Sequence, residues 1–127
     1  MTSDFQYPDW SEHTILIAED IDSNFAVLSA LLQKTNIRIL RAHNGEEAVE
    51  TSLLNPSVRL ILMDISMPCC DGIEALRQIR QQLPGKIVIA QTAHDFSSVI
   101  AGENFDAFLR KPIRRKQLLE VLSLYLS

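Results

Sequence analysis

Short apolar runs rich in β-branched residues alternate along the chain with longer stretches in which apolar residues recur at helical spacing. The apolar runs span residues 14–18, 36–42, 58–63, 86–91 and 105–109, and the helical stretches span residues 21–34, 46–54, 73–82, 97–102 and 113–126. Strands and helices that alternate in this way form a parallel sheet with right-handed crossovers and helices on both faces. The pattern therefore predicts one α/β domain of five strand and helix pairs.

The polarity of each apolar run predicts its place in the sheet, because central parallel strands are buried on both faces. The first, third and fourth runs are continuously apolar over residues 15–18, 60–63 and 87–90. Arg38 and Arg41 interrupt the second run, and Asp106 and Arg110 bracket the fifth. These two runs are predicted to be the edge strands. The result is a flavodoxin-like (βα)5 three-layer sandwich with strand order 2-1-3-4-5.

Two features are predicted at the start of the chain. The domain is expected to occupy residues 14–127, with residues 1–13 as an N-terminal extension or linker. Tyr7 and Trp10 either fold back on the domain or belong to a frayed tail, and the sequence leaves both open. Asp22 or Ser23 is available as the N-cap of the first helix.

Composition narrows the function. The chain has 127 residues and a net charge of −4, which argues against a nucleic-acid-binding module. It has neither the apolar run of a membrane span nor a secretory signal, so a cytoplasmic location is expected. Cys69 and Cys70 are adjacent, and with the three histidines they show no metal-ligand spacing.

Five side chains of complementary chemistry follow the predicted strands. They are Glu19, Asp20, Asp64, Thr92 and Lys111. Because ligand sites in open parallel sheets lie beyond the carboxyl ends of the strands, we expect these side chains to converge. Three clustered carboxylates need a cation, and hard oxygen ligands favour Mg²⁺. An aspartate can then accept a phosphoryl group, with the lysine and the threonine stabilising the transferred charge.

Four stretches of the sequence resemble the successive signatures of receiver domains from two-component response regulators. They are the acidic pair Glu19-Asp20, residues 63–72 (MDISMPCCDG), residues 89–93 (IAQTA) and residues 105–112 (FDAFLRKP). The resemblance covers residues 14–126. The chain departs from the family pattern at Asn104, where a glycine is common, and at Phe108, where a tyrosine is frequent.

The resemblance implies the roles of the residues around the acid cluster. Asp64 would be the phosphoacceptor, and Glu19, Asp20, Asp64 and the backbone carbonyl of Ser66 would bind Mg²⁺. Lys111 would pair with the phosphoryl oxygens. The Lys111-Pro112 peptide bond would be cis, which would aim the lysine at the site.

The resemblance also implies a switch and its partners. Thr92 would move toward the phosphoryl group and let Phe108 turn inward. Ser66 and His94 hold positions that tune dephosphorylation, although His94 could equally be an ordinary loop histidine. The phosphodonor would be a histidine kinase or a histidine phosphotransfer protein. A phosphorylation-dependent homodimer through the fourth helix, fifth strand and fifth helix is also expected.

Other interpretations remain. A haloacid-dehalogenase-type phosphatase would make the chain an enzyme, but it needs a second aspartate where Ser66 stands. A flavodoxin would bind a phosphate at a first loop that is acidic here, at residues 19–22. The domain could also be part of a hybrid sensor histidine kinase. Otherwise we expect no enzyme activity beyond self-catalysed phosphoryl transfer and dephosphorylation.

Overall fold

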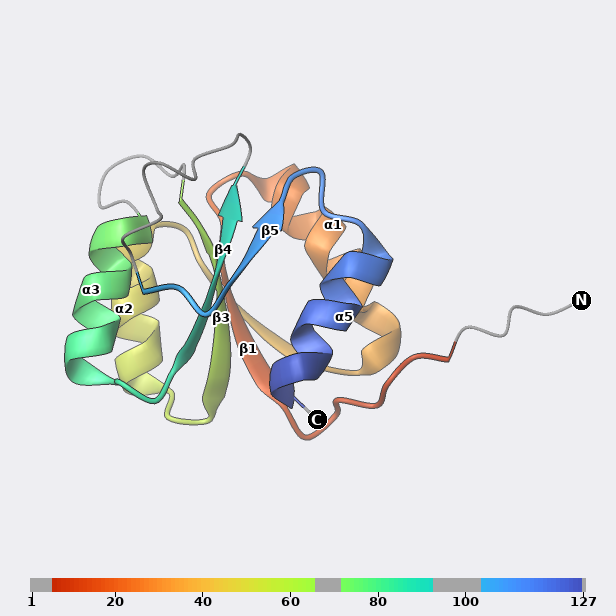
Figure 1. Cartoon of the computed structure of the whole chain (residues 1–127), viewed down its shortest axis with the longest axis horizontal. Coiled ribbons are helices and arrows are strands. Elements are labelled where there is room, and N and C mark those ends of the chain that lie inside the picture. Colours follow the sequence, from red (N-terminus) through yellow and green to blue (C-terminus); the bar gives the residue numbers. More distant parts are fainter. Residues whose placement is uncertain (1–5, 66–71, 93–103, 127) are drawn as a thin grey trace, which may run out of the picture.

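The computed structural model describes residues 6–65, 72–92 and 104–126, and these form a five-stranded parallel sheet of order β2-β1-β3-β4-β5. Helices α1 and α5 cover one face of the sheet, and α2 and α3 cover the other (Figure 1). The elements are β1 (Thr14–Ala18), α1 (Asp22–Leu32), the 3-10 helix η1 (Gln33–Thr35), β2 (Arg38–Ala42), α2 (Gly45–Leu54), β3 (Val58–Asp64), α3 (Gly72–Gln82), β4 (Ile87–Thr92), β5 (Ala107–Arg110) and α5 (Arg115–Leu126). The flavodoxin-like fold and its strand order are confirmed, while the helix expected over residues 97–102 lies outside the described residues.

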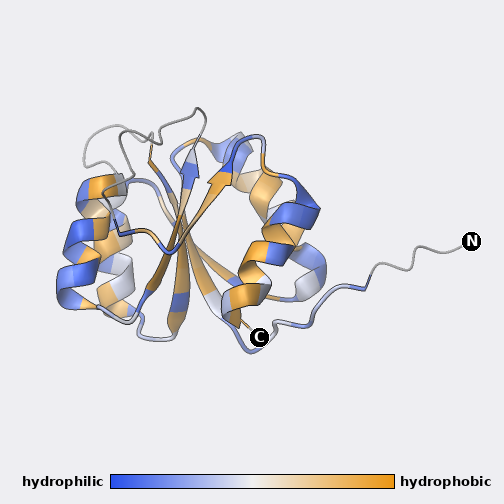
Figure 2. Ribbon diagram, viewed as in Figure 1, coloured by the Kyte–Doolittle hydropathy of each residue, from blue (hydrophilic) through white to orange (hydrophobic). Residues whose placement is uncertain are grey.

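The burial of the strands follows the predicted difference between centre and edge. All five residues of β1 are buried, and so are all residues of β3 except Arg59. The edge strands β2 and β5 contain mainly exposed or half-buried residues. In Figure 2, hydrophobic colour is concentrated on the strands and on the helix faces that meet them.

Alternation along the strands divides the interior into two apolar layers. Leu16 of β1 and Ile61 of β3 pack with Leu76 of α3 in the layer under α2 and α3. Ile15 and Leu28, from β1 and α1, belong to the layer under α1 and α5. The sheet is therefore covered on both faces, which leaves the loops at its ends to carry polar chemistry.

Two element boundaries differ from the sequence prediction. β2 begins at Arg38 instead of residue 36, because Asn36 adopts a left-handed conformation (φ 64°) that ends η1. Helix α1 has Ile21 at its N-cap position, with no side-chain cap, so the expectation of Asp22 or Ser23 as cap is wrong. The Ile21 N–H instead donates to the Glu19 carboxylate at 3.2 Å. This bond satisfies the N–H of the N-cap residue, so an acidic side chain of the candidate site holds the backbone where α1 begins.

The segment before β1 folds back on the domain. Trp10 is 4% exposed and packs within the α1–α5 layer, and its backbone N–H donates to the Thr35 carbonyl at 2.7 Å. The Tyr7 ring lies 5.5 Å from the Lys34 ammonium and 5.6 Å from the Arg115 guanidinium, in cation–π geometry. Tyr7 and Trp10 therefore follow the first of the two arrangements considered. The assignment of residues 1–13 as an extension and 14–127 as the domain stays a prediction.

Candidate functional site

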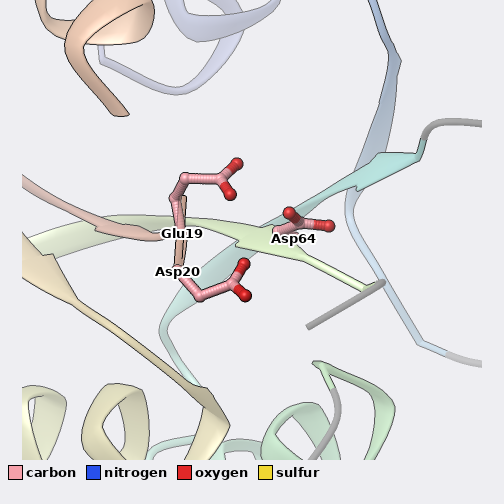
Figure 3. Close-up of side chains that lie close together, drawn as sticks. All are labelled: Glu19, Asp20 and Asp64. Atoms are coloured by element: carbon pink, nitrogen blue, oxygen red, sulfur yellow. The ribbon is translucent and has the colours of Figure 1, made fainter. Parts of the chain in front are cut away.

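Three carboxylates meet at the carboxyl end of the sheet. Glu19 and Asp20 directly follow β1, and Asp64 is the last residue of β3 (Figure 3). One ligand oxygen from each lies within 4.8 Å of the others. Glu19 is fully buried, Asp64 is 2% exposed and Asp20 is half-buried. The convergence expected from the sequence is present for all three side chains.

Strand register explains how residues so distant in sequence come together. Ala18 of β1 is opposite Met63 of β3, so the next residues, Glu19 just after β1 and Asp64 at the end of β3, lie side by side. Parallel strands place their carboxyl ends at one edge, so each strand needs to contribute only one or two side chains.

The lysine and threonine reach the same edge from β4 and β5. Thr92, 6% exposed, is opposite Arg110 in the register, and its carbonyl accepts the Lys111 N–H at 2.7 Å. The Lys111 ammonium lies 2.9 Å from Asp64 Oδ2 and 3.4 Å from Glu19 Oε1. A half-buried cation therefore contacts two of the three carboxylates.

Burial and charge change the acidity of two of these groups. Burial raises the pKa of Glu19 above its ordinary value, and the neighbouring Asp64 carboxylate raises it further. Burial lowers the pKa of Lys111, but its hydrogen bond to Asp64 and the charges of Asp64 and Glu19 outweigh this and raise it. Lys111 is therefore held as a cation, while the cluster favours a proton or a cation beside Glu19.

Arg41 on β2 also supports the cluster, a role the sequence analysis did not identify. Its Nε and Nη2 atoms donate to the Glu19 carbonyl at 3.1 and 3.0 Å, and Nη1 lies 2.9 Å from Asp22 Oδ1. The guanidinium also lies 4.6 Å from the centre of the Phe25 ring. In the sequence, Arg41 is visible as an arginine that interrupts an apolar run. A solvent-exposed edge strand explains that interruption equally well. Arg41 fixes the backbone between the two acidic residues.

Gly72, the first residue of α3, allows this helix to begin close against the end of β3. A Cβ atom at this position would lie 2.9 Å from Met63 Cγ and 3.0 Å from the Asp64 carbonyl oxygen. Real Cβ atoms essentially never approach neighbours as closely as the first distance. A side chain at this position would displace the backbone that carries Asp64.

The remaining predicted residues are placed as follows. Phe108 on β5 is 47% exposed and contacts Phe105 edge-on, with ring centroids 5.8 Å apart. The Lys111-Pro112 bond is cis, as expected. Ser66 and His94 lie outside the described residues. Within the described ranges, no helix is long and apolar enough to cross a membrane.

Comparison with known proteins identifies the family. Residues 15–123 match the family described as the response regulator receiver domain. Among curated proteins, Two-component system protein A of Emericella nidulans is 40% identical over 114 residues, which are 85% of this chain and 17% of that protein. The chain spans less than a third of the length of the first curated relatives it matches.

Solved structures share the fold and include complexes. The receiver domain of Ssk1 from Saccharomyces cerevisiae, solved with the histidine phosphotransfer signaling protein Ypd1, matches with a TM-score of 0.75 and 27% identity, covering 96% of this chain and 92% of that one. The CheX-CheY-BeF3-Mg+2 complex from Borrelia burgdorferi matches with a TM-score of 0.82 and 26% identity, covering 91% and 90%. With its parallel sheet and its acidic cluster at the strand ends, the chain belongs to the response regulator receiver domain family of two-component signalling systems.

Proposed function

We propose that the chain accepts a phosphoryl group on Asp64 from a phosphorylated histidine and transmits the signal by changing conformation. The observation that carries this proposal is the contact between the Lys111 ammonium and Asp64 Oδ2 at 2.9 Å, beside two further carboxylates. A nucleophilic oxygen, a fixed cation and a set of hard oxygen ligands are the parts that phosphoryl transfer requires. The phosphodonor is a histidine kinase or a histidine phosphotransfer protein. The solved complex with Ypd1 supports this choice of partner.

The donor set fits Mg²⁺. Glu19, Asp20 and Asp64 offer oxygen atoms within 4.8 Å of one another, and Mg²⁺ prefers one or two carboxylates together with water and phosphate oxygens. In the proposal the carbonyl of Ser66 completes the protein ligands. When bound, the ion offsets the negative charge of the carboxylates and of the phosphoryl oxygens. Support also comes from the Borrelia burgdorferi CheX-CheY complex, which was solved with BeF3 and Mg+2.

The side chains of this chain then have distinct tasks. An Asp64 oxygen attacks the phosphorus atom, an O–P bond forms, and the P–N bond to the donor histidine breaks with its electron pair returning to the imidazole. Lys111 neutralises a phosphoryl oxygen, because its raised pKa keeps it protonated. The Thr92 hydroxyl donates a hydrogen bond to another phosphoryl oxygen. This chemistry is self-catalysed, so the chain acts as a signalling domain and not as an enzyme with turnover.

Labelling with acetyl phosphate tests the proposal. Intact-mass spectrometry should show one added phosphoryl group on the wild type in Mg²⁺ and none in EDTA, because the carboxylates otherwise repel the anionic donor. Asp64→Asn should not be labelled, whereas Asp9→Asn, at an exposed aspartate of the N-terminal segment, should behave as the wild type. Equal labelling of Asp64→Asn and the wild type would refute Asp64 as the acceptor.

The conformational readout is proposed at the face formed by the fourth helix, β5 and α5. Thr92 and Phe108 link Asp64 to this face, and Phe108 has room to change because nearly half of it is exposed. Leu124 of α5 is 77% exposed and could join a homodimer contact. Light scattering and amide hydrogen exchange with and without beryllofluoride test this. Unchanged mass and unchanged exchange around Phe108 and α5 would rule this face out.

A second context is favoured by one observation. The chain spans only 17% of Two-component system protein A and 30% of the Thermotoga maritima cyclic di-GMP phosphodiesterase that it resembles. The same site could therefore serve as the receiver of a longer protein, including a hybrid sensor histidine kinase. In either context we propose a cytoplasmic location. Phosphotransfer profiling against candidate kinases would compare the rate of transfer from each donor. The donor with the fastest transfer would separate a stand-alone regulator from the receiver of a longer protein.

A further inference from the structure

Asp20 is the member of the acid cluster whose carboxylate has no contact of its own. The Glu19 carboxylate accepts the Ile21 N–H at 3.2 Å, and the Lys111 ammonium lies 2.9 Å from Asp64 Oδ2. Within the part of the chain that the structure describes, no hydrogen bond or ion pair reaches the Asp20 carboxylate. Two of the three acidic groups are therefore fixed through their own oxygens, whereas the position of Asp20 depends on the backbone that carries it.

Arg41 holds the peptide bond that leads into Asp20. Its Nε and Nη2 atoms donate to the Glu19 carbonyl at 3.1 and 3.0 Å, and the Glu19 N–H donates to the Ala42 carbonyl at 2.9 Å. In Figure 3 the Glu19 and Asp20 side chains leave the backbone in opposite directions, so the orientation of this peptide bond decides where each carboxylate lies. A rotation of the peptide bond would move Asp20 out of the cluster.

The guanidinium group is itself held on two further sides. Its Nη1 atom lies 2.9 Å from Asp22 Oδ1, the centre of the Phe25 ring is 4.6 Å away, and only 18% of the Arg41 side chain is exposed. The planar fork of an arginine can meet a carbonyl and a carboxylate at the same time, whereas a lysine ammonium on its flexible stem is a single point charge. The arrangement therefore requires an arginine and not merely a positive charge.

The firmness of the ligands is what distinguishes Mg²⁺ from Ca²⁺. Mg²⁺ needs near-ideal octahedral geometry with oxygen atoms at about 2.0–2.1 Å, whereas Ca²⁺ accepts about six to eight oxygen atoms at about 2.3–2.6 Å in flexible arrangements. Both ions carry the same charge, so the three carboxylates attract them by similar Coulomb energies. The preference for one ion over the other then depends on how firmly each carboxylate is placed.

We propose that Arg41 is a positioning residue that makes the acid cluster selective for Mg²⁺ over Ca²⁺ by fixing the backbone at Asp20. The inference rests on the proposed function, because it takes the cluster to be the Mg²⁺ site, and it adds a determinant of ion specificity outside the carboxylates. An arginine that only stabilised the fold would change the melting temperature and leave the balance between the two ions unchanged.

Isothermal titration calorimetry of the full chain, with Mg²⁺ alone and with Ca²⁺ alone, tests the proposal without a phosphodonor. Arg41→Lys keeps the charge but loses the fork of donors. The Kd for Mg²⁺ should rise about tenfold, as for other residues that orient metal ligands, and the Kd for Ca²⁺ should rise less than about twofold. The ratio of the Ca²⁺ constant to the Mg²⁺ constant should therefore fall at least about fivefold. Arg38→Lys, at an exposed position on the same strand, should leave both constants unchanged.

A second variant decides the matter if Arg41→Lys does not fold. Asp22→Ala removes the partner of Nη1 at a side chain that is 91% exposed, and it should lower the same ratio at least about twofold. The charge that it removes affects both ions alike and cancels in the ratio. A wild type that binds no Mg²⁺ would refute the metal site and this inference with it. A wild type that binds Mg²⁺, with an unchanged ratio in the variant, would overturn the role of Arg41 and leave the proposed function intact.

Discussion

Neutralising Asp20 should stabilise the protein in the absence of a divalent ion. Its carboxylate shares the cluster with Glu19 and Asp64, with ligand oxygens no more than 4.8 Å apart. At that distance two like charges repel by about 3.5 kcal/mol at an effective dielectric constant of about 20. Because Asp20 is half-buried, solvent screening reduces the net gain from Asp20→Asn to about 1–2 kcal/mol. The melting temperature in EDTA should rise by about 4–8 °C.

Calorimetric scans in EDTA and in excess Mg²⁺ measure this effect. The wild type should gain about 2.7 kcal/mol when Mg²⁺ exceeds its Kd about 100-fold, whereas Asp20→Asn should lose most of this gain. Glu50→Gln makes a similar change at an exposed position on α2 and should alter neither scan. An Asp20→Asn protein that melts no higher in EDTA and responds fully to Mg²⁺ would refute both the repulsion and the ligand assignment.

Three further predictions follow from individual contacts. The pKa of Glu19 is raised in the folded protein, chiefly by burial, so the folded state binds a proton here more tightly than the unfolded state does. The resulting contribution to the free energy of unfolding is complete below pH 4.5, the ordinary pKa, and is lost as the pH rises through the raised pKa of the folded state. Urea unfolding in EDTA should therefore show no advantage of Glu19→Gln below pH 4.5 and a growing advantage above it, and a constant difference at all pH values would contradict the shift. Arg80 pairs with Asp106 at 2.6 Å and is 17% exposed, so Arg80→Met should lose about 1.5–3 kcal/mol in urea unfolding, while Arg77→Met, at a 62% exposed side chain, should lose less than about 1 kcal/mol. Trp10→Ala should lose about 3–5 kcal/mol by thermal melting if the N-terminal segment contributes to the core, and a loss below about 1 kcal/mol would show that it does not.

The sequence predicted the architecture because the burial of each strand follows the pattern of its apolar residues. A continuously apolar run such as residues 60–63 has only one stable place, the centre of a parallel sheet, and the charged Arg38 marks an edge. The convergence of Asp64 and Lys111 followed from the same topology, because every parallel strand ends at the same edge. These predictions required no knowledge of side-chain contacts.

Features that depend on a side chain's tertiary partner were missed or left open. Arg41 could be placed on an edge strand, but its double hydrogen bond to the Glu19 carbonyl depends on how the residue after β1 lies beside β2. The cap of α1 was assigned to the nearest suitable residues, whereas the helix has no side-chain cap and the Glu19 carboxylate accepts the N–H of the N-cap residue Ile21. Trp10 carries no periodic pattern with its neighbours, so its burial could not be inferred from the sequence. Local patterns identify elements, and contacts between elements need the structure.

The buried position of Trp10 gives this protein a natural optical reporter. It is the only tryptophan in the chain, so intrinsic emission excited at the red edge comes from one indole. That indole lies in the α1–α5 layer and not in the acid cluster, and it is 4% exposed. An indole shielded from water emits at shorter wavelength than a hydrated one. A fluorescence spectrum can therefore follow the opening of this layer during titrations at the acid cluster, without an added dye.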